Sequence, residues 1–500
     1  MSARLGPQAG SAMSWQSVLH FGVQGIMLLR LLVLARLLAP ADFGLQAIAL
    51  LSVSLLLRLT ELGMAPALIQ RAVVEPRHYH AAWTVGLLRA VGVATVVFFA
   101  APLFGLAFAE PRATPLVRAA ALLPLLQAAA SIKIAELTRE LRFRGLAGLR
   151  LSEAVATTLV SIALAQRLGA WALILGTLAG AAVFAALSYF VAPYRPRLEL
   201  DLDALVPLVR FGRWIFARSL VALAGQSILE LAISRRLGVA ELGLYFLAAR
   251  LAFLPSTAAS AIVGTVAFPM YSRLQDNVER AAGAFRTQVL GTAALLLPVY
   301  ALILALAPSL TEELLGPRWI GSAPVIRILA LASLVGLLGD IVDPILNAFG
   351  RPAAVTLIEV VQSAVLISSV WLLAGAYGLP GAAASWLPAI AVSQVLSVVL
   401  LRQLFERPFR GIGAALLFLV GAAVAGGWVA WWLDRTIEGV VGVLVAAAAG
   451  AGLIGVGLLV GERVLGFGLG VAAVQLFPRL ASVLERMRVL PVRDGAESDS

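Results

Sequence analysis

Long, uninterrupted runs of apolar residues alternate with short polar segments along the chain. A helix needs about 20 apolar residues to cross the hydrocarbon core of a bilayer, so each run predicts one transmembrane span. A transmembrane β-barrel would show short segments of alternating hydrophobicity instead. The runs predict about fourteen spans, at residues 14–37, 42–64, 81–108, 114–136, 147–167, 169–192, 209–235, 241–268, 284–308, 322–347, 353–375, 379–402, 410–433 and 438–461.

The composition agrees with this pattern. Hydrophobic residues make up 61% of the 500 residues, charged residues make up 13%, and the mean hydropathy is +0.95. A soluble domain is about 45–50% apolar and about 25% charged. The chain is therefore expected to be an all-α polytopic membrane protein. The predicted loops do not exceed about 20 residues, so no separate soluble catalytic domain is expected.

Two stretches resemble each other across the two halves of the chain. Residues 35–45, ARLLAPADFGL, align with residues 234–244, SRRLGVAELGL, at an offset of 199 residues, and Asp42 corresponds to Glu241. Such an internal repeat in an apolar chain is typical of transporters. The predicted parts are a cytoplasmic tail at 1–13, six-helix bundles at 14–205 and 206–404, two additional helices at 405–461, and a cytoplasmic tail at 462–500 with a disordered end.

The basic residues predict the orientation of the chain. An even number of spans places both termini on one side, and cytoplasmic loops carry the excess of Lys and Arg. With both termini in the cytoplasm, the cytoplasmic segments hold 24 of these residues, the opposite loops hold 7 and the spans hold 7. The net charge of +11 is spread singly over short loops, so it indicates topology and not nucleic-acid binding.

Arginines deep within the spans are the candidate substrate-binding residues. An arginine at mid-bilayer costs about 2.5–3.5 kcal/mol, so such a side chain is expected to face a hydrated cavity or to pair with an acid. The deepest ones lie on spans that correspond in the two halves, and they predict one shared cationic cavity; structural ion pairs are the alternative. These residues are Arg30, Arg58, Arg218 and Arg250. Arg118 and Arg327 lie near span starts and are expected to snorkel to the membrane surface.

Acidic residues within or beside the spans are candidates for a gate or for coupling to H⁺ or Na⁺. Those singled out are Asp42, Glu61, Glu230 and Glu241. Asp42 and Glu241 each begin a span, where an acid is also favoured as a helix cap. Glu61 lies three residues after Arg58, so a structural ion pair on one helix face is an equally good interpretation.

The sequence offers little for catalysis. It has no cysteine and only three histidines, which excludes disulfides and thiolate chemistry and disfavours a histidine-rich metal site. No catalytic constellation and no Walker motif is present, so neither an enzyme nor an ATP-driven pump is expected, and no cofactor or metal is predicted.

Several motifs together resemble the polysaccharide transporter family. They are LARLLAPADFGL at 34–45, ELG at 61–63, ALIQR at 67–71, RELRFR at 139–144, YRPR at 194–197, LGLY at 242–245, LP at 254–255 and FPMYSRLQ at 268–275. These are the Wzx-type oligosaccharide and lipopolysaccharide flippases of the multidrug/oligosaccharidyl-lipid/polysaccharide exporter superfamily. The resemblance covers about residues 14–405.

This resemblance implies two six-helix bundles around a central cavity in the bacterial inner (cytoplasmic) membrane. It also implies alternating-access transfer of a polyprenyl-pyrophosphate-linked oligosaccharide, or of an exopolysaccharide or lipopolysaccharide precursor, from the inner to the outer leaflet. A cationic cavity suits this substrate because the arginine fork binds phosphate through several donors. Membrane lipid, a polysaccharide polymerase and other biosynthesis proteins are the implied partners.

Three alternatives to a flippase stay open. An ion-coupled antiporter for small molecules or drugs belongs to the same superfamily, but one for cationic drugs would need an acidic cavity. A membrane polysaccharide polymerase or ligase would be expected to carry a large outer loop with paired functional residues. A scaffold without transport activity would not need arginines on four repeat-related spans.

Overall fold

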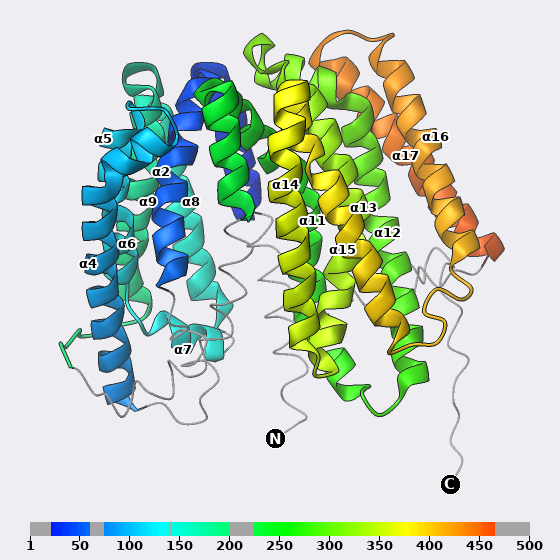
Figure 1. The fold of residues 1–500 in the computed structure, drawn as a ribbon, viewed down its shortest axis with the longest axis horizontal. Coiled ribbons are helices and arrows are strands. Elements are labelled where there is room, and N and C mark those ends of the chain that lie inside the picture. The colour runs from blue at the N-terminus through cyan, green and yellow to red at the C-terminus, as the bar shows by residue number, and fades with distance from the viewer. Residues whose placement is uncertain (1–21, 61–74, 141, 200–224, 466–500) are drawn as a thin grey trace. The chain divides into compact units, whose positions relative to one another are not determined.

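The computed structural model describes residues 22–60, 75–140, 142–199 and 225–465, and within these ranges the regular structure is helical (Figure 1). The chain divides into two compact units, Met1–Phe246 and Leu247–Ser500. Helix α11 (Val239–Arg273) runs from the first unit into the second.

The first unit contains two unlabelled helical segments, at residues 22–37 and 225–237. Its other helices are α2 (Pro40–Leu59), α4 (Pro76–Ala107), α5 (Ala113–Ala120), α6 (Leu122–Ala128), α7 (Ile134–Arg139), α8 (Phe143–Leu168) and α9 (Ala170–Val191). Helices α8 and α9 form a hairpin, and α2 packs against α4, α5 and α9 (Figure 1).

Small residues allow the α8–α9 hairpin to pack closely. A Cβ atom on Gly176 would collide with the hydroxyl of Ser161, and one on Gly180 would collide with the hydroxyl of Thr157. Such close approach over small residues is a common way for helices to associate in membranes, where the hydrophobic effect does not drive them together. The turn between the two helices is at Gly169, whose φ of 56° suits glycine.

The second unit contains the rest of α11 and the remaining helices. They are α12 (Val278–Ser309), the π-helix η2 (Leu310–Leu315), the 3₁₀-helix η3 (Pro317–Trp319), α13 (Ser322–Ala348), α14 (Pro352–Ala384), α15 (Trp386–Arg402), α16 (Gly413–Asp434) and α17 (Gly439–Leu465). Helix α14 is interrupted at Gly378, whose φ is 64°.

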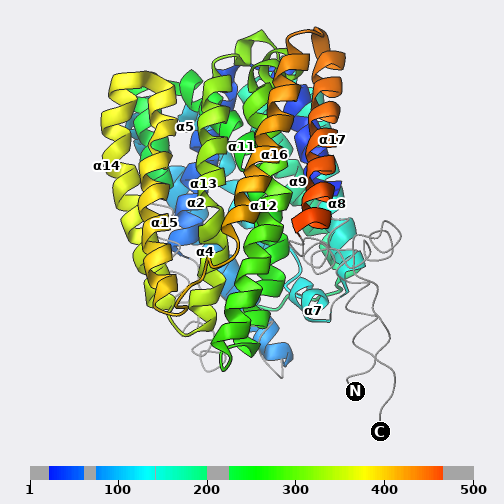
Figure 2. The same cartoon turned by 90° about the vertical axis from the view of Figure 1, so that its right-hand side faces the viewer.

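The core of the second unit is aromatic and aliphatic. Tyr271, Phe285 and Ile345 are fully buried, and Phe405 packs against Phe285 with a ring-centroid distance of 6.3 Å. Helices α16 and α17 run side by side, and α16 also packs along α12 (Figure 2). The last two helices that the structure describes, α16 and α17, thus belong to the same unit as α12.

The helices account for the predicted spans. Ten helices in the described ranges are long and apolar enough to cross a membrane, and two shorter apolar helices, Ala113–Ala128 and Trp386–Arg402, lie where further spans are predicted. The segments 22–37 and 225–237 coincide with the described parts of the two remaining predicted spans. Large apolar side chains lie on the outer surface, such as Phe190 at 81% exposure, as lipid contact requires. The protein is a multi-pass helical membrane protein.

One predicted span is wrong at its end. The span expected at 114–136 is helical only to Ala128, and α7 follows as a separate short helix. The chain turns because Ser131 is held at the C-terminal end of α9: its N–H donates to Ser188 Oγ at 2.8 Å and its hydroxyl donates to the Ala192 carbonyl at 2.7 Å. Within the span, the helix also breaks at Ala121, near Pro124, which lacks an N–H for the usual bond to the fourth residue before it.

Candidate functional site

The turn before α2 is organised by Asp42. Its Oδ2 accepts a hydrogen bond from the Ala39 N–H at 3.0 Å, which caps α2. Its Oδ1 accepts one from the Ala170 N–H at 3.0 Å, at the first residue of α9. One carboxylate therefore satisfies the amides at two helix N-termini, where the helix dipoles favour negative charge. The capping interpretation of Asp42 describes this geometry.

The two copies of the sequence repeat touch each other within the first unit. A Cβ atom on Gly44 would collide with the carbonyl oxygen of Val239, and one on Gly243 would collide with the carbonyl oxygen of Pro40. Gly44 and Gly243 are equivalent at the offset of 199 residues, and so are Pro40 and Val239. The contact is therefore reciprocal, and only glycine allows the first turns of α2 and α11 to approach this closely.

Two arginines cap helix C-termini in the same unit. Arg235 Nε donates to the Ala107 carbonyl at 2.6 Å, and the neighbouring Ser234 hydroxyl donates to the Phe108 carbonyl at 2.8 Å, at the end of α4. Arg89 donates to the Leu57 carbonyl, at the end of α2. The last carbonyls of a helix have no partner within the helix, and a cation there also complements the helix dipole.

Glu110 and Arg112 form a bidentate pair in the turn between α4 and α5. Arg112 Nε donates to Glu110 Oε1 at 2.7 Å, and its Nη2 donates to Oε2 at 2.9 Å. Glu110 is 9% exposed. The hydrogen bonds from Arg112 hold the pKa of Glu110 below its ordinary value. The pair stiffens the turn that follows the end of α4, where Ser234 and Arg235 bind the last carbonyls.

The chain after α9 is held against the start of α4. The Tyr194 hydroxyl lies 2.9 Å from His80 Nδ1, and the two rings stack with centroids 5.4 Å apart. One turn further along α4, Thr84 Oγ1 accepts a hydrogen bond from the Glu199 N–H at 3.0 Å. Burial raises the pKa of Tyr194 to about 12, so the phenol stays protonated and can donate. The YRPR motif at 194–197 thus begins with a docking residue.

Comparison with known proteins decides the family. The family profile described as "Polysaccharide biosynthesis protein" matches residues 33–324, which is more than half of the chain and includes both copies of the repeat. The chain belongs to this polysaccharide biosynthesis protein family.

Two curated relatives are also named as polysaccharide biosynthesis or transport proteins. The chain is 25% identical over 347 residues to the lipopolysaccharide biosynthesis protein WzxC of Escherichia coli, with 68% of this chain and 70% of WzxC covered. It is 28% identical over 320 residues to the succinoglycan biosynthesis transport protein ExoT of Rhizobium meliloti, covering 64% of this chain and 65% of ExoT. The chain thus spans about two thirds of the length of each of these relatives.

Solved structures share the fold. The lipid II flippase MurJ in an inward closed conformation matches with a TM-score of 0.74 at 13% identity, over 90% of this chain and 99% of MurJ. An inward-facing multidrug resistance MATE transporter of the MOP superfamily matches with a TM-score of 0.58 at 15% identity, over 80% of this chain and 95% of that one. At these identities, the likeness concerns the fold alone.

The predicted cationic residues of this family member lie in different places. Arg30 is half-buried on the segment 22–37, Arg58 is exposed in the last turn of α2, and Arg250 is exposed on α11 in the second unit. Arg218 lies outside the described residues. Arg58 has no hydrogen bond or ion pair with another residue that the structure describes. A shared cavity that brings the four together stays a prediction.

The predicted acids also differ in their surroundings. Glu230 is 6% exposed, and its Oε1 accepts a hydrogen bond from Gln226 Nε2 at 3.1 Å, one turn earlier on the same helix. Glu241 is half-buried in the first turn of α11. Glu61 lies outside the described residues, so its pairing with Arg58 stays a prediction. In the ranges that the structure describes, no group of three or more His, Cys, Asp or Glu side chains is placed to hold a metal ion.

Sequence reasoning missed the contact between the two copies of the repeat and the hydrogen bonds of Arg327. The signal for the first is the glycine that recurs in both copies, as Gly44 and Gly243. Arg327 was expected to snorkel to the surface, yet its Nε donates to the Leu304 carbonyl at 2.8 Å. The signal for this bond is Pro308, four residues after Leu304, which has no N–H to offer that carbonyl.

Proposed function

We propose that the protein is a flippase that transfers a lipid-linked oligosaccharide across the membrane during polysaccharide biosynthesis. The observation that carries this proposal is the family match over residues 33–324, which runs from the end of the first predicted span through the ninth and so includes parts of both halves. The named relatives WzxC and ExoT are a lipopolysaccharide biosynthesis protein and a succinoglycan biosynthesis transport protein. The transporter fold shared with MurJ is compatible with the same task.

The chemistry of the chain fits an anionic, glycosylated lipid. A pyrophosphate group needs cationic donors in a region that excludes lipid, because an unpaired charge is costly in hydrocarbon. Arg30, Arg58, Arg218 and Arg250 would supply those donors, and guanidinium groups bind phosphate oxygens in bidentate fashion. The lipid chain of the substrate would remain in the bilayer while the sugars cross through the cavity.

The loop charges support the proposed orientation in the membrane. The excess of Lys and Arg favours cytoplasmic termini, with the YRPR motif and the segment around α7 on the cytoplasmic face. A bacterial inner membrane is the location that suits a precursor assembled on the cytoplasmic leaflet. In this orientation Asp42 and Glu241 lie at the outer face, where movement of the α2 and α11 first turns would act as a gate.

Glu230 is the best placed acid for ion coupling. It is buried on a membrane helix beside a neutral amide, Gln226, and a buried carboxylate is costly unless it binds a proton or a cation. Exchange of H⁺ or Na⁺ at Glu230 would connect transport to an ion gradient. Glu230→Gln should then reduce transport and abolish its dependence on that gradient.

The test uses cells depleted of the protein and complemented with variants. Depletion should cause lipid-linked oligosaccharide to accumulate while surface polysaccharide falls, and the wild type should reverse both effects. Arg58→Ala and Arg218→Ala should fail to reverse them although they reach the membrane at normal levels. Arg195→Ala, which changes an exposed loop arginine, is the matched control and should restore both.

Other outcomes favour the alternatives. Normal surface glycan without accumulation would contradict the flippase and favour an ion-coupled antiporter for small molecules. Accumulation of single repeat units that have already reached the outer leaflet would favour a polymerase or ligase. Full rescue by the arginine variants would leave the flippase in place but assign these arginines to structural ion pairs.

A further inference from the structure

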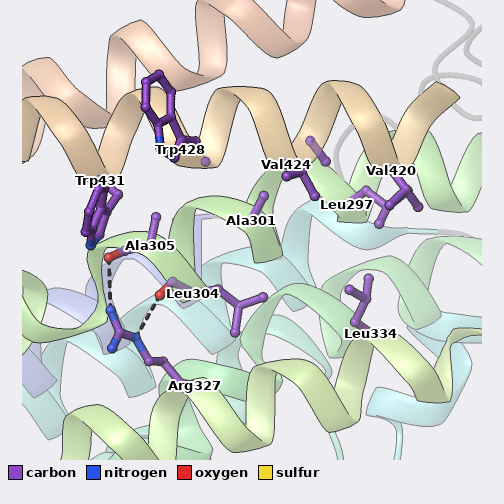
Figure 3. Close-up of a pocket in the computed structure, with 12 residues that line it drawn as sticks. Leu297, Ala301, Leu304, Ala305, Arg327, Leu334, Val420, Val424, Trp428 and Trp431 are labelled. Atoms are coloured by element: carbon purple, nitrogen blue, oxygen red, sulfur yellow. Dashed lines mark hydrogen bonds between the residues drawn. The ribbon is translucent and has the colours of Figure 1, made fainter. Parts of the chain in front are cut away.

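A pocket of about 510 Å³ lies within the second unit, between α12, α13 and α16. Its lining is almost entirely apolar (Figure 3). The lining includes Leu297, Leu334, Arg327, Val420, Val424 and Trp431. The volume lies in the range of sites that hold small-molecule ligands, about 300–1,000 Å³.

The pocket has a polar end and an apolar end. Figure 3 shows Arg327 and Trp431 together at one end, with Val420, Leu297 and Leu334 at the other. Arg327 is fixed in place, because its Nε donates to the Leu304 carbonyl at 2.8 Å and its Nη2 donates to the Ala305 carbonyl at 3.3 Å. A charged group therefore stands at a fixed position at the end of an apolar slot.

A second cation lies at the same end. The guanidinium carbon of Arg435 is 4.0 Å from the centroid of the Trp431 ring, in a cation–π contact at the C-terminus of α16. Trp431 thus lines the pocket at the same end as Arg327 and also contacts an exposed arginine. Tryptophan and arginine at the end of a span are typical of the boundary between hydrocarbon and lipid headgroups.

The mouth of the pocket opens outward along α16. Three residues that line it on α16 are exposed: Val420 is 43% exposed, Val424 is 64% exposed and Trp428 is 61% exposed. Because α16 is a membrane span, the medium at this mouth is lipid. An apolar cavity of this kind does not hold water favourably, so a hydrocarbon chain is its natural filler.

We propose that this pocket is a binding site for an anionic phospholipid of the surrounding membrane. One acyl chain fills the slot, and the phosphate lies at the end formed by Arg327, Trp431 and Arg435. The slot runs along α16 from Val420 to Trp431, which is about 16 Å at 1.5 Å per residue. That length is about half of the roughly 30 Å hydrocarbon core, so it suits one chain of a single leaflet rather than a long polyprenyl chain.

The bound lipid would stabilise the packing of α16 and α17 on the rest of the unit. The slot separates α16 from α13, and α16 carries α17 with it through the contact of Gly426 and Gly450. A chain in the slot completes the contact between α16 and the rest of the unit. Basic pockets between transmembrane helices are known to bind anionic headgroups, so the charge and the cavity together define the ligand class.

The experiment measures lipid binding to the full-length protein purified in neutral detergent, by titration with single lipids read out by native mass spectrometry. The probes are phosphatidylglycerol, phosphatidylcholine and a polyprenyl phosphate. We expect phosphatidylglycerol to bind at least about fivefold more tightly than phosphatidylcholine. Arg435→Gln should remove that preference, a loss of about fivefold.

The variants separate the chain from the headgroup. Val424→Trp and Val420→Trp each place a large side chain over the slot and should abolish binding of both phospholipids; two variants are used so that one folding failure does not decide the result. Arg410→Gln changes an exposed arginine before the opposite end of α16 and should leave binding unchanged. Melting curves without added lipid identify the variants that fold.

Three results would overturn the proposal. Equal affinity for phosphatidylcholine and phosphatidylglycerol would remove the headgroup site. An equal loss in Arg410→Gln and Arg435→Gln would show a general surface charge effect. Tighter binding of the polyprenyl phosphate, lost in Val424→Trp, would assign the slot to a polyprenyl chain instead of a phospholipid.

Discussion

The carboxylate of Asp42 accepts a hydrogen bond from the backbone N–H of Ala170, a residue 128 positions further along the chain. The same side chain caps its own helix through the Ala39 N–H. A single acid therefore ties the N-terminus of α2 to the N-terminus of α9. This link explains why the turn at the start of α2 carries an acid at its third helical position.

Removal of this double cap should be costly. Asp42→Ala leaves two helix amides without their partner, and each lost cap costs about 1 kcal/mol, so the free energy of unfolding should fall by about 2 kcal/mol. Asp42→Asn keeps one acceptor oxygen and should lose about half as much. Thermal unfolding in detergent measures the effect. The control Glu279→Ala removes an exposed acid from the first turn of α12, whose N-cap is Asn277, and should change stability by less than about 0.5 kcal/mol.

The reciprocal glycine contact gives a second prediction. Gly44→Ala and Gly243→Ala each place a methyl group against a carbonyl oxygen of the other copy of the repeat, so each should destabilise the first unit by about 3 kcal/mol or more. The double variant should cost less than the two single changes combined, because one substitution already separates the two first turns.

Gly86→Ala is the matched control for both changes. A Cβ atom at Gly86, in the middle of α4, would meet no atom within 4 Å, so this variant should be neutral or slightly stabilising. Folded yield and melting temperature in detergent check all four variants. Equal effects at Gly44 and Gly86 would show that helix propensity, and not the close contact, decides the outcome.

The fold was largely predictable because hydrocarbon imposes a simple rule on the sequence. Each span must bury its backbone polar groups in a helix and present apolar side chains to lipid, and the run of apolar residues records this directly. The prediction for the span at 114–136 is wrong at its end because this rule does not include polar contacts between helices. Its last turn unwinds for the sake of two hydrogen bonds from Ser131 to α9, which depend on residues 57 and 61 positions away.

The polar contacts were harder to predict for the same reason. The sequence shows that Asp42 opens a helix, but it does not show that Ala170 lies beside it. Likewise, it shows an arginine near the start of a span at Arg327, but the partner is a carbonyl on another helix. Depth in the membrane identifies arginines that need a partner, and only the packing of the helices decides which partner they meet.

The pair of Glu110 and Arg112 should make stability depend on pH. The pKa of Glu110 is lowered from its ordinary value of 4.5 in the folded protein, chiefly by the hydrogen bonds from Arg112. A lowered folded-state pKa stabilises the fold at pH values above the unfolded pKa, and this contribution is lost as the pH falls through the folded pKa. The melting temperature of the wild type should therefore fall by more than that of Glu110→Gln as the pH is lowered from about 6 to well below 4.5.

Arg112→Gln provides the matching test. It removes the donors that hold the pKa of Glu110 down, so its pH dependence should resemble that of Glu110→Gln. The melting temperatures of the two variants and the wild type, each measured across this pH range in the same detergent, give the comparison. A steep acid transition that persists in both variants would assign the pH dependence to other carboxyl groups.

Arg327 and Pro308 should be coupled in energy through the carbonyl of Leu304. In the wild type, the Leu304 carbonyl lacks the usual α-helical partner four residues on because Pro308 has no N–H, and Arg327 Nε donates to it at 2.8 Å. Arg327→Leu should leave that carbonyl unsatisfied and cost about 1–3 kcal/mol. Pro308→Ala restores an N–H at the position that normally bonds to residue 304, so in that background the same substitution should cost about 1 kcal/mol less.

Thermal unfolding of the wild type, the two single variants and the double variant completes the cycle. Additive effects would show that Arg327 stabilises the protein through its charge or its packing rather than by replacing the hydrogen bond that Pro308 removes.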